Sequence, residues 1–287
     1  MTALILEGRA LAKTLREELR EGIGSFTAAT GVVPSVTVVR VEGDPSSERY
    51  LRTIRKSCDD LGIRFAERVL PVEISQEDLE ATVRGVNADP AVHGLLLHLP
   101  LPPQFNATNV IAQIDPLKDV DGVHPYNAGL LAQERPRFVP NTPAGGMELL
   151  KRYGIEVEGK RTTVIGRSVV VGKPMALMLM AADATVTICH LKTQDLAAAV
   201  RDAEILVCAA GEPRLVTGDM LSPGVVIVDF GINVLEDGRV VGDVEFASAA
   251  EVAGAITPVP GGTGPVTNMM LLRNVLRAAQ IATGVEP

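Results

Sequence analysis

The chain has 287 residues, of which 46% are hydrophobic and 22% charged, with a net charge of −8 and a pI near 5.1. That length can form one large or two ordinary domains. The acidic balance argues against a nucleic-acid partner or an anionic membrane surface. No apolar run approaches the roughly 20 residues that cross a membrane, and no signal peptide opens the chain. The three cysteines lack metal-ligand spacing, so we expect a cytoplasmic protein.

Helices and strands alternate through the first half of the chain. Their crossovers of a dozen residues or more predict a parallel sheet flanked by helices, an α/β fold. The apolar spacing predicts helices at 7–29, 47–61 and 75–87, and β-branched or apolar runs predict strands at 34–41, 64–70 and 92–98.

Two loops follow the third strand, one rich in proline (Leu99–Pro103) and one polar (Asp115–Pro125). Asp119, Asp121 and His124 in the polar loop raise the question of a metal site. The loop lacks the alternating oxygen ligands of a calcium site and has too few soft ligands for zinc. We therefore expect no metal.

The strand at 92–98 carries two histidines. His93 and His98 are five residues apart, which places them on opposite faces of a strand. One of them is expected to be structural.

Strand–helix units recur in the second half of the chain, after a helix that ends near Tyr153 and links the two parts. Repeated units of this kind after a glycine turn predict a Rossmann-like sheet. We expect a domain of residues 1–140 together with a closing helix at about 267–287, and a Rossmann-like domain at 141–266. The predicted strands are 162–165, 185–189, 205–211, 225–231 and 255–257, with a helix at 195–202.

The first strand of this second part ends in the turn Gly166-Arg-Ser-Val-Val-Val-Gly172, and Pro174 follows in the first turn of a helix. Glycines let a phosphate approach the backbone, and unpaired amides at a helix N-terminus favour an anion. The motif predicts a phosphate cradle, with an ordinary strand-to-helix turn as the alternative.

The end of the next strand bears on the choice of dinucleotide. An acidic residue there binds the 2′-hydroxyl of NAD, whereas basic residues suit the 2′-phosphate of NADP. Here the strand runs into His190-Leu-Lys-Thr193 without a carboxylate, and Arg167 stands in the cradle. The pattern favours NADP. The alternative is that Lys192 and Arg167 are ordinary solvated charges.

Taken together, these stretches resemble the bifunctional methylenetetrahydrofolate dehydrogenase/methenyltetrahydrofolate cyclohydrolase family over essentially the whole chain. The resemblance implies a two-domain α/β subunit, folate in the cleft between the domains, NADP on the second domain, and a homodimer. The matching segments are Ser47–Tyr50, Leu99–Pro102, Lys118–Gly122 with His124 and Pro125, Thr142–Pro143, Gly166–Ser168 with Val171, Gly172 and Pro174, Gly242–Val244, and Thr257–Gly262 with Gly264 and Pro265.

The resemblance also implies roles for individual residues. Tyr50 is expected to pack on the folate rings and Asp121 to anchor the pterin, although by themselves these residue types suit a half-buried core tyrosine and a turn-forming aspartate. The expected substrate contacts also include Pro100, Leu101 and Gly262, and the expected cofactor contacts are Gly166, Arg167, Ser168, Leu191, Lys192 and, near the nicotinamide, Ile232.

Two positions depart from the family pattern at the catalytic centre. The family's catalytic lysine lies four residues after the tyrosine, where this chain has Ile54, and the glutamine that hydrogen-bonds that lysine is replaced by His98. Lys56 is no substitute, because six residues from Tyr50 is about 240° of net helix rotation. We expect an NADP-dependent dehydrogenase with weak or lost cyclohydrolase activity, and Tyr50, Asp121 and His98 as its catalytic candidates.

Several alternatives stay open at this point. His98 can serve as a replacement base, because an imidazole titrates near pH ~6.5. The chain can also be a non-catalytic folate-binding paralogue, or act on a different one-carbon substrate. Leu191, where many relatives carry a polar contact to the 2′-phosphate, leaves NAD open as the cofactor.

Overall fold

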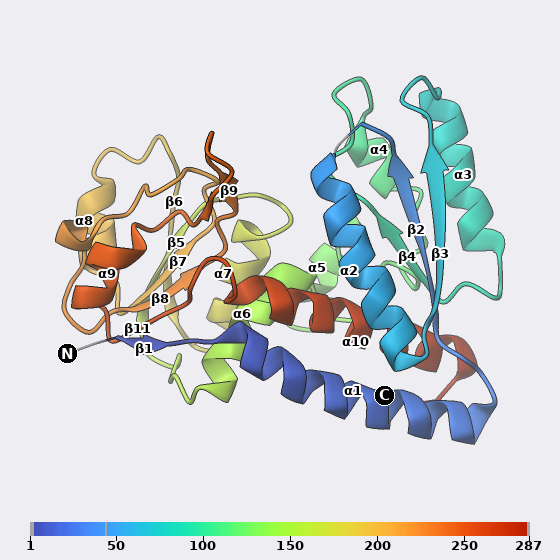
Figure 1. Cartoon of the computed structure of the whole chain (residues 1–287), viewed down its shortest axis with the longest axis horizontal. Coiled ribbons are helices and arrows are strands. Elements are labelled where there is room, and N and C mark those ends of the chain that lie inside the picture. Colours follow the sequence, from blue (N-terminus) through green and yellow to red (C-terminus); the bar gives the residue numbers. More distant parts are fainter. Residues whose placement is uncertain (1–2, 44, 286–287) are drawn as a thin grey trace. The chain divides into compact units, whose positions relative to one another are not determined.

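The computed structural model describes residues 3–43 and 45–285, and at 45–47 and 49 only the backbone. The chain divides into two compact units. We call Met1–Leu15 with Pro140–Met270 the large-sheet unit, and Arg16–Val139 with Leu271–Pro287 the small-sheet unit. Two long helices, α1 (Gly8–Thr30) and α10 (Thr263–Thr283), each begin in the large-sheet unit and end in the small-sheet unit (Figure 1).

The large-sheet unit is built on six parallel strands in the order β1-β11-β8-β7-β5-β6. The Rossmann-like sheet predicted from the repeated strand–helix units is therefore confirmed. The strands are β1 (Leu4–Ile5), β5 (Arg161–Ile165), β6 (Thr185–Cys189), β7 (Ile205–Cys208), β8 (Val226–Asp229) and β11 (Ala255–Ile256).

Helices cover both faces of this sheet (Figure 1). Successive strand residues point to opposite faces, so Val164 packs in a core with Leu150 and Met175 of the helices α6 and α7, whereas Ile165 packs in a second core. Burial on both faces explains why β7 is a continuous apolar run, whereas β6 at the edge of the sheet is largely exposed. The helices are α6 (Asn141–Arg152), α7 (Gly172–Ala181), α8 (Leu196–Arg201) and α9 (Phe246–Val252), with a 3₁₀ turn, η1, at Gly218–Met220.

The small-sheet unit has three parallel strands in the order β3-β2-β4. Val39, Leu95 and Leu97 of the sheet form a buried cluster with Leu79 and Val83 of α3. The elements are β2 (Ser35–Val41), α2 (Pro45–Leu61), β3 (Arg64–Leu70), α3 (Gln76–Ala88), β4 (Gly94–Leu97), α4 (Ala107–Ile111) and α5 (Pro125–Ala132).

The structure differs from the predicted elements in six places. Strand β4 is shorter than 92–98, so both histidines flank it instead of lying within it. Helix α10 begins at Thr263, four residues before the predicted start. Helices α5 and α9, the short strand β1, and a hairpin of β9 (Asn233–Val234) and β10 (Val240–Val241) were not predicted. Among the described residues, no helix combines the length and apolar character that crossing a membrane requires.

Candidate active site

The glycine turn after β5 is shaped by two close backbone contacts. Gly166 has φ +120°, and a Cβ there would lie 2.1 Å from the carbonyl oxygen of Ala209 after β7. A Cβ at Gly172 would lie 2.2 Å from the carbonyl oxygen of Gly166. No side chain fits at either position, so the turn packs directly against neighbouring backbone. It lies at the carboxyl end of the sheet, where α/β proteins bind ligands.

The hydrogen bonds of this turn correct one expectation about its amides. Ser168 Oγ accepts from the amides of Val171 (3.1 Å) and Gly172 (3.3 Å), at the start of α7. These helix amides are therefore paired within the protein. The amides of residues 167–170 make no hydrogen bond within the described chain. The backbone amides that are available to a phosphate are thus those before α7, not those of its first turn.

The segment after β6 lies beside this turn, because Ile165 and Cys189 are paired at the ends of β5 and β6. His190 Nδ1 accepts from the amide of Lys192 (3.2 Å), and Thr193 Oγ1 accepts from the amide of His190 (3.0 Å). This tight turn leaves Leu191 and Lys192 exposed. The structure therefore presents a cation at the neighbouring strand end, as the sequence predicted.

Ile232 and Gly262 line one cavity of about 230 Å³ in the large-sheet unit, between the loop after β8 and the segment Pro258–Pro265. Ile232 is 70% exposed. Arg9, which sequence reasoning missed, also lines this cavity. Its amide and that of Gly8 donate to the carbonyl oxygen of Gly261. A Cβ at Gly8 would lie 1.6 Å from the carbonyl oxygen of Gly262. The glycine before Arg9 was the available signal for this close approach.

Two buried aspartates behind this cavity were also missed. Asp229 ends β8 and accepts from the amides of Gly231 (2.8 Å), Asp243 (3.1 Å) and Val244 (3.0 Å). Burial and, to a smaller extent, the charge of Asp243 raise its pKa to about 6, although these amides favour the ionised form. The segment Gly242–Val244 was noted only as a matching motif. Its contact with Asp229 joins positions 14 residues apart.

In the small-sheet unit, three of the predicted site residues converge. The rings of Tyr50 on α2 and His98 after β4 are 6.1 Å apart between centroids, tilted by 33°. Burial raises the pKa of Tyr50, and the charge of Asp121 raises it further. Tyr50 nevertheless keeps 37% of its surface exposed. A tyrosine with one open face beside a carboxylate and an imidazole can stack on a planar ligand.

Asp119 in the polar loop is a structural residue. Its carboxylate is fully buried and accepts from the amides of Val123 (3.2 Å) and His124 (2.8 Å) and from Asn127 Nδ2 (2.8 Å). Burial raises its pKa against the effect of these donors. His124 caps α5, because its Nδ1 accepts from the amide of Tyr126 (3.0 Å). The loop that carries Asp121 is thus held by its own side chains. The described residues contain no group of three or more potential metal ligands.

His93 is structural, as expected for one of the two histidines. Its Nδ1 lies 3.1 Å from the amide nitrogen of Ser35 and 2.9 Å from the Oγ of that residue. Burial, followed by the charges of Arg64 and Lys118, lowers its pKa. His93 therefore joins β2 to the start of β4 as a neutral ring.

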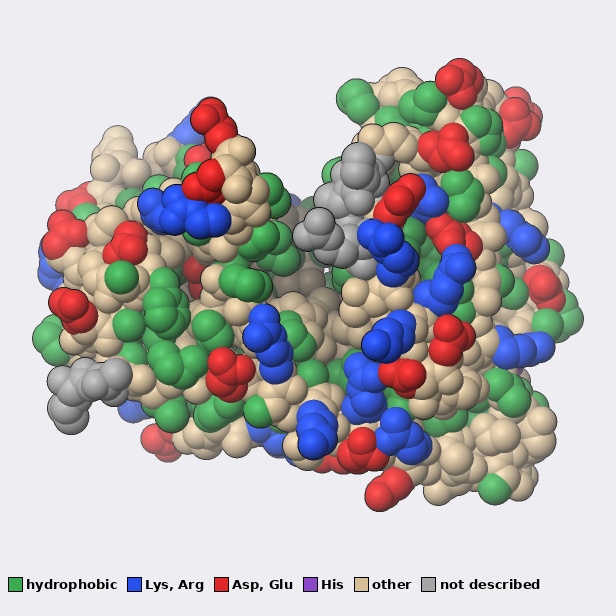
Figure 2. Space-filling view, in the orientation of Figure 1, with side chains coloured by type: hydrophobic (Ala, Val, Ile, Leu, Met, Phe, Trp, Pro, Cys, Tyr) green, Lys and Arg blue, Asp and Glu red, His purple; other side chains and the backbone are tan. Residues whose placement is uncertain are grey.

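The face of α2 that follows Tyr50 is apolar. Ile54, four residues on, has no exposed surface, and Cys58 one turn further is also buried. Lys56 is exposed and lines a separate cavity of about 470 Å³ with Arg16, Arg52 and other polar residues of α1 and α2. Figure 2 shows Lys and Arg side chains gathered over this part of the unit. Lys56 thus lies on a different face from Tyr50, as its helical spacing predicted.

Pro100 and Leu101 follow His98 in an irregular segment. The Leu99–Pro100 peptide is cis, and Leu101 packs against the buried cluster of the small-sheet unit. Pro100 is exposed. Of these two predicted substrate contacts, Pro100 is therefore the more exposed, and Leu101 is partly exposed.

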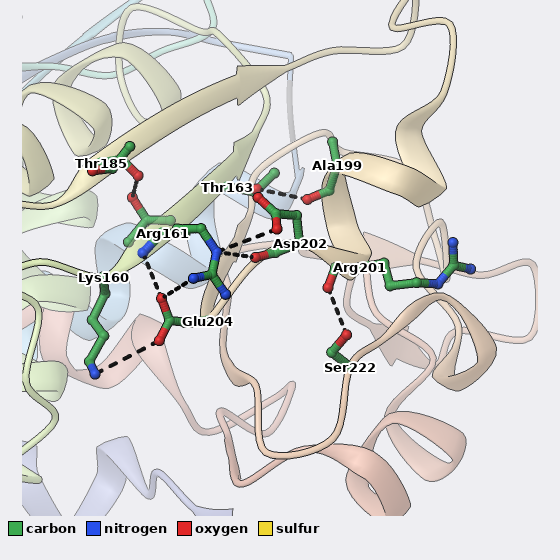
Figure 3. A network of polar contacts seen from close by, with 10 residues as sticks. Lys160, Arg161, Thr163, Thr185, Ala199, Arg201, Asp202, Glu204 and Ser222 are labelled. Atoms are coloured by element: carbon green, nitrogen blue, oxygen red, sulfur yellow. Dashed lines mark hydrogen bonds and ion pairs between the residues drawn. The ribbon is translucent and has the colours of Figure 1, made fainter.

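A cavity of about 510 Å³ lies at the opposite edge of the large sheet, near the first residues of β5 and β7. Arg161 there pairs with Glu204 (3.2 Å) and Asp202 (3.4 Å), and Lys160 lies 3.8 Å from Glu204 (Figure 3). Lys160, Arg161 and Glu204 in its lining are paired with one another. None of the predicted site residues lines it.

The six-stranded parallel sheet, its glycine turn and the basic strand end define a dinucleotide-binding α/β protein. The residues present fit such a cofactor, because a Cβ at Gly166 or Gly172 would fill the turn and the amides of the intervening loop are open. The chain belongs to the tetrahydrofolate dehydrogenase/cyclohydrolase family. Residues 6–121 match the family's catalytic domain and residues 140–283 its NAD(P)-binding domain.

Three relatives illustrate how close the similarity is. The bifunctional protein FolD of Roseiflexus castenholzii is 66% identical over 281 residues, covering 98% of each chain. The crystal structure of the bifunctional FolD methylenetetrahydrofolate dehydrogenase/cyclohydrolase from Campylobacter jejuni has a TM-score of 0.94 at 42% identity, covering 97% of this chain and 99% of that one. The Trypanosoma brucei enzyme, solved with NADP cofactor and an inhibitor, has a TM-score of 0.94 at 38% identity, covering 98% of each chain.

Proposed function

We propose that this protein oxidises 5,10-methylenetetrahydrofolate to 5,10-methenyltetrahydrofolate with NADP, and that its cyclohydrolase activity is weak or absent. The weak or absent cyclohydrolase activity is inferred from the position of Ile54. It is fully buried one helical turn after Tyr50, where the family resemblance calls for the catalytic lysine. The titles of the Campylobacter jejuni and Trypanosoma brucei structures include both activities, and we limit this chain to the first because of its own residues.

The cofactor half of the proposal rests on the large-sheet unit. When bound, NADP would supply the acceptor for the hydride that leaves the methylene carbon of the folate. Gly166, Arg167 and Ser168 would hold its phosphates, and Lys192 with Leu191 would lie at its 2′-phosphate. Ile232 would contact the nicotinamide end through its backbone. Because hydride transfer depends chiefly on placing donor and acceptor, these residues act by positioning.

The folate half rests on the small-sheet unit. Tyr50 stacks on the folate rings with its open face, and Asp121 accepts a hydrogen bond from the pterin. Pro100 and Leu101 complete the substrate contacts on this unit. Hydrolysis of the methenyl product requires in addition a group that activates water and relays its proton. A fully buried isoleucine can do neither.

The nearness of His98 to Tyr50 favours a second candidate, a fully bifunctional enzyme with His98 as base. Its ring is close enough to the Tyr50 ring to face the same ligand. In that case His98→Ala removes hydrolysis and spares hydride transfer. An unchanged rate of hydrolysis in His98→Ala rejects this candidate.

Paired assays on wild type, Ile54→Lys and Ile54→Met test the main proposal. The wild-type protein should reduce NADP with methylenetetrahydrofolate, while added methenyltetrahydrofolate disappears no faster than in buffer. Ile54→Lys should gain hydrolysis. Ile54→Met, an unbranched side chain of similar length without the amine, should not. Rapid hydrolysis by the wild type refutes the loss of the second activity, and no NADP reduction refutes the first.

We also propose that the protein is a homodimer, as the family resemblance implies. Light scattering of the purified protein tests this, and a mass of one subunit contradicts it. A catalytically inactive folate-binding protein would instead bind folate without turnover on NADP or NAD. The open cradle at Gly166 supports an enzyme, because a folate-binding module has no evident need for it.

A further inference from the structure

The buried Asp229 and Asp243 join three loops at the carboxyl edge of the large sheet. Asp229 binds the amides of Gly231, Asp243 and Val244, as described above. Asp243 Oδ2 accepts from the amides of Ala210 (2.6 Å) and Gly211 (3.0 Å) after β7. The loops after β7, after β8 and before α9 are therefore held by one pair of side chains.

The negative charge of this pair is not balanced by a cation in contact. Besides the three amides that donate to Asp229 and the two that donate to Asp243, Asn233 Nδ2 donates to Asp243 Oδ1 (2.9 Å). All six donors are therefore neutral amides. Among the described residues, neither carboxylate forms an ion pair. Both side chains have almost no exposed surface. Charge in such a place acts over a longer range than charge in water.

The pair lies directly behind the wall of the cavity that contains Ile232. Gly231 lines this cavity, and a Cβ at Gly231 would lie 2.3 Å from Asp243 Oδ1. A Cβ at Gly242 would likewise lie 1.9 Å from Asp229 Oδ2. Glycines thus bring the backbone and the carboxylates together, and only a thin layer of main chain separates the charge from the cavity.

We propose that Asp229 and Asp243 are positioning residues that fix the loops around the nicotinamide and, through their charge, favour the oxidised ring over the reduced one. This inference rests on the proposed function, because it takes the cavity at Ile232 as the nicotinamide site. The oxidised nicotinamide ring carries a positive charge and the reduced ring carries none. A buried negative pair therefore stabilises NADP relative to NADPH.

The test compares the dissociation constants of NADP and NADPH in wild type, Asp243→Asn and the control Asp237→Asn. In Asp243→Asn the ratio of the NADP to the NADPH constant should rise about fivefold or more. Asp237→Asn removes a carboxylate that is exposed and pairs with Arg239 on the hairpin, and it should leave the ratio unchanged. A purely structural role would weaken both ligands alike, and an unchanged ratio in Asp243→Asn overturns the proposal.

A second variant and one wild-type measurement keep the test decisive if Asp243→Asn fails to fold. Asp229→Asn should shift the ratio in the same direction. Asp229 faces two other titratable groups, Asp243 and Cys208. Because the pKa of Asp229 is about 6, the wild-type ratio should also rise between pH 7.5 and 5.5. A constant ratio in both experiments overturns the proposal. Absence of NADP binding to the wild type would instead overturn the proposed function.

Discussion

The substitution Asp229→Asn tests how much a buried charged carboxylate lowers the free energy of unfolding of the large-sheet unit. The folded-state pKa of Asp229 is about 6, against about 3.9 in an unfolded chain. A difference of about two pH units corresponds to about 3 kcal/mol at 1.36 kcal/mol per unit. Because the folded pKa is raised, this destabilisation is fully present above pH ~6 and is relieved as the pH falls towards ~4.

The Asp229→Asn variant has no such pH dependence. It removes the cost of the buried charge. However, one of the three backbone N–H groups that donate to Asp229 then faces the NH2 group of asparagine instead of an oxygen. That loss costs about 1.5–3 kcal/mol. The two effects nearly cancel at pH 7.5, so we expect the variant to fold with a stability close to that of the wild type.

Urea unfolding of both proteins at pH 7.5 and pH 5.0 checks this reasoning. Between the two pH values the wild type should gain about 1.4 kcal/mol relative to Asp229→Asn. Other groups titrate in both proteins and cancel in the difference. A stability gap that stays the same at both pH values, or that moves in the variant's favour at pH 5.0, refutes the assignment of a raised pKa to Asp229.

Three further substitutions and one control variant test other parts of the structure. Gly166→Ala places a methyl group 2.1 Å from the oxygen of Ala209, so NADP affinity should fall at least about tenfold by fluorescence titration. Gly85→Ala is the control, because no atom lies within 4 Å of its new Cβ; it should stabilise α3 by about 0.5–1 kcal/mol. Asp119→Ala removes the acceptor of two backbone amides and of one N–H of Asn127 and should lower the free energy of unfolding by about 3 kcal/mol in urea, while a loss below about 1 kcal/mol contradicts this structural role of Asp119. Lys192→Met should raise the Michaelis constant for NADP about tenfold and leave that for NAD unchanged, and equal effects on both would place Lys192 away from the 2′-phosphate.

Local patterns predicted most of the elements because their causes lie within a few residues. Ser75 caps α3 by accepting from the amide of Asp78, three residues on. The glycines of the cradle occur where close backbone approach requires them. The inward face of α2, from Ile54 to Cys58, follows from helical spacing alone. In each case the partner that determines the structure is a near neighbour in the chain.

The features that sequence analysis missed depend on distant partners. The two residues of β1 become a strand only because β11, some 250 positions later, lies beside them. Asp229 and Asp243 look like ordinary polar residues until the fold removes water from both. The pairing of α7 amides by Ser168 is local, but serine hydroxyls serve so many purposes that the residue type alone does not reveal it.

The parallel pairing of Leu4 with Ala255 and Ile5 with Ile256 means that the large sheet is finished by the first residues of the chain. A fragment cut at Pro140 would contain five of the six strands and leave β11 as an open edge, ready to pair with another molecule. During synthesis, the amino-terminal segment must wait for nearly the whole polypeptide to emerge before it finds its neighbour. Tags or fusions placed ahead of Leu4 therefore bear on the assembly of the nucleotide-binding part, although that part is encoded mainly by the second half of the gene.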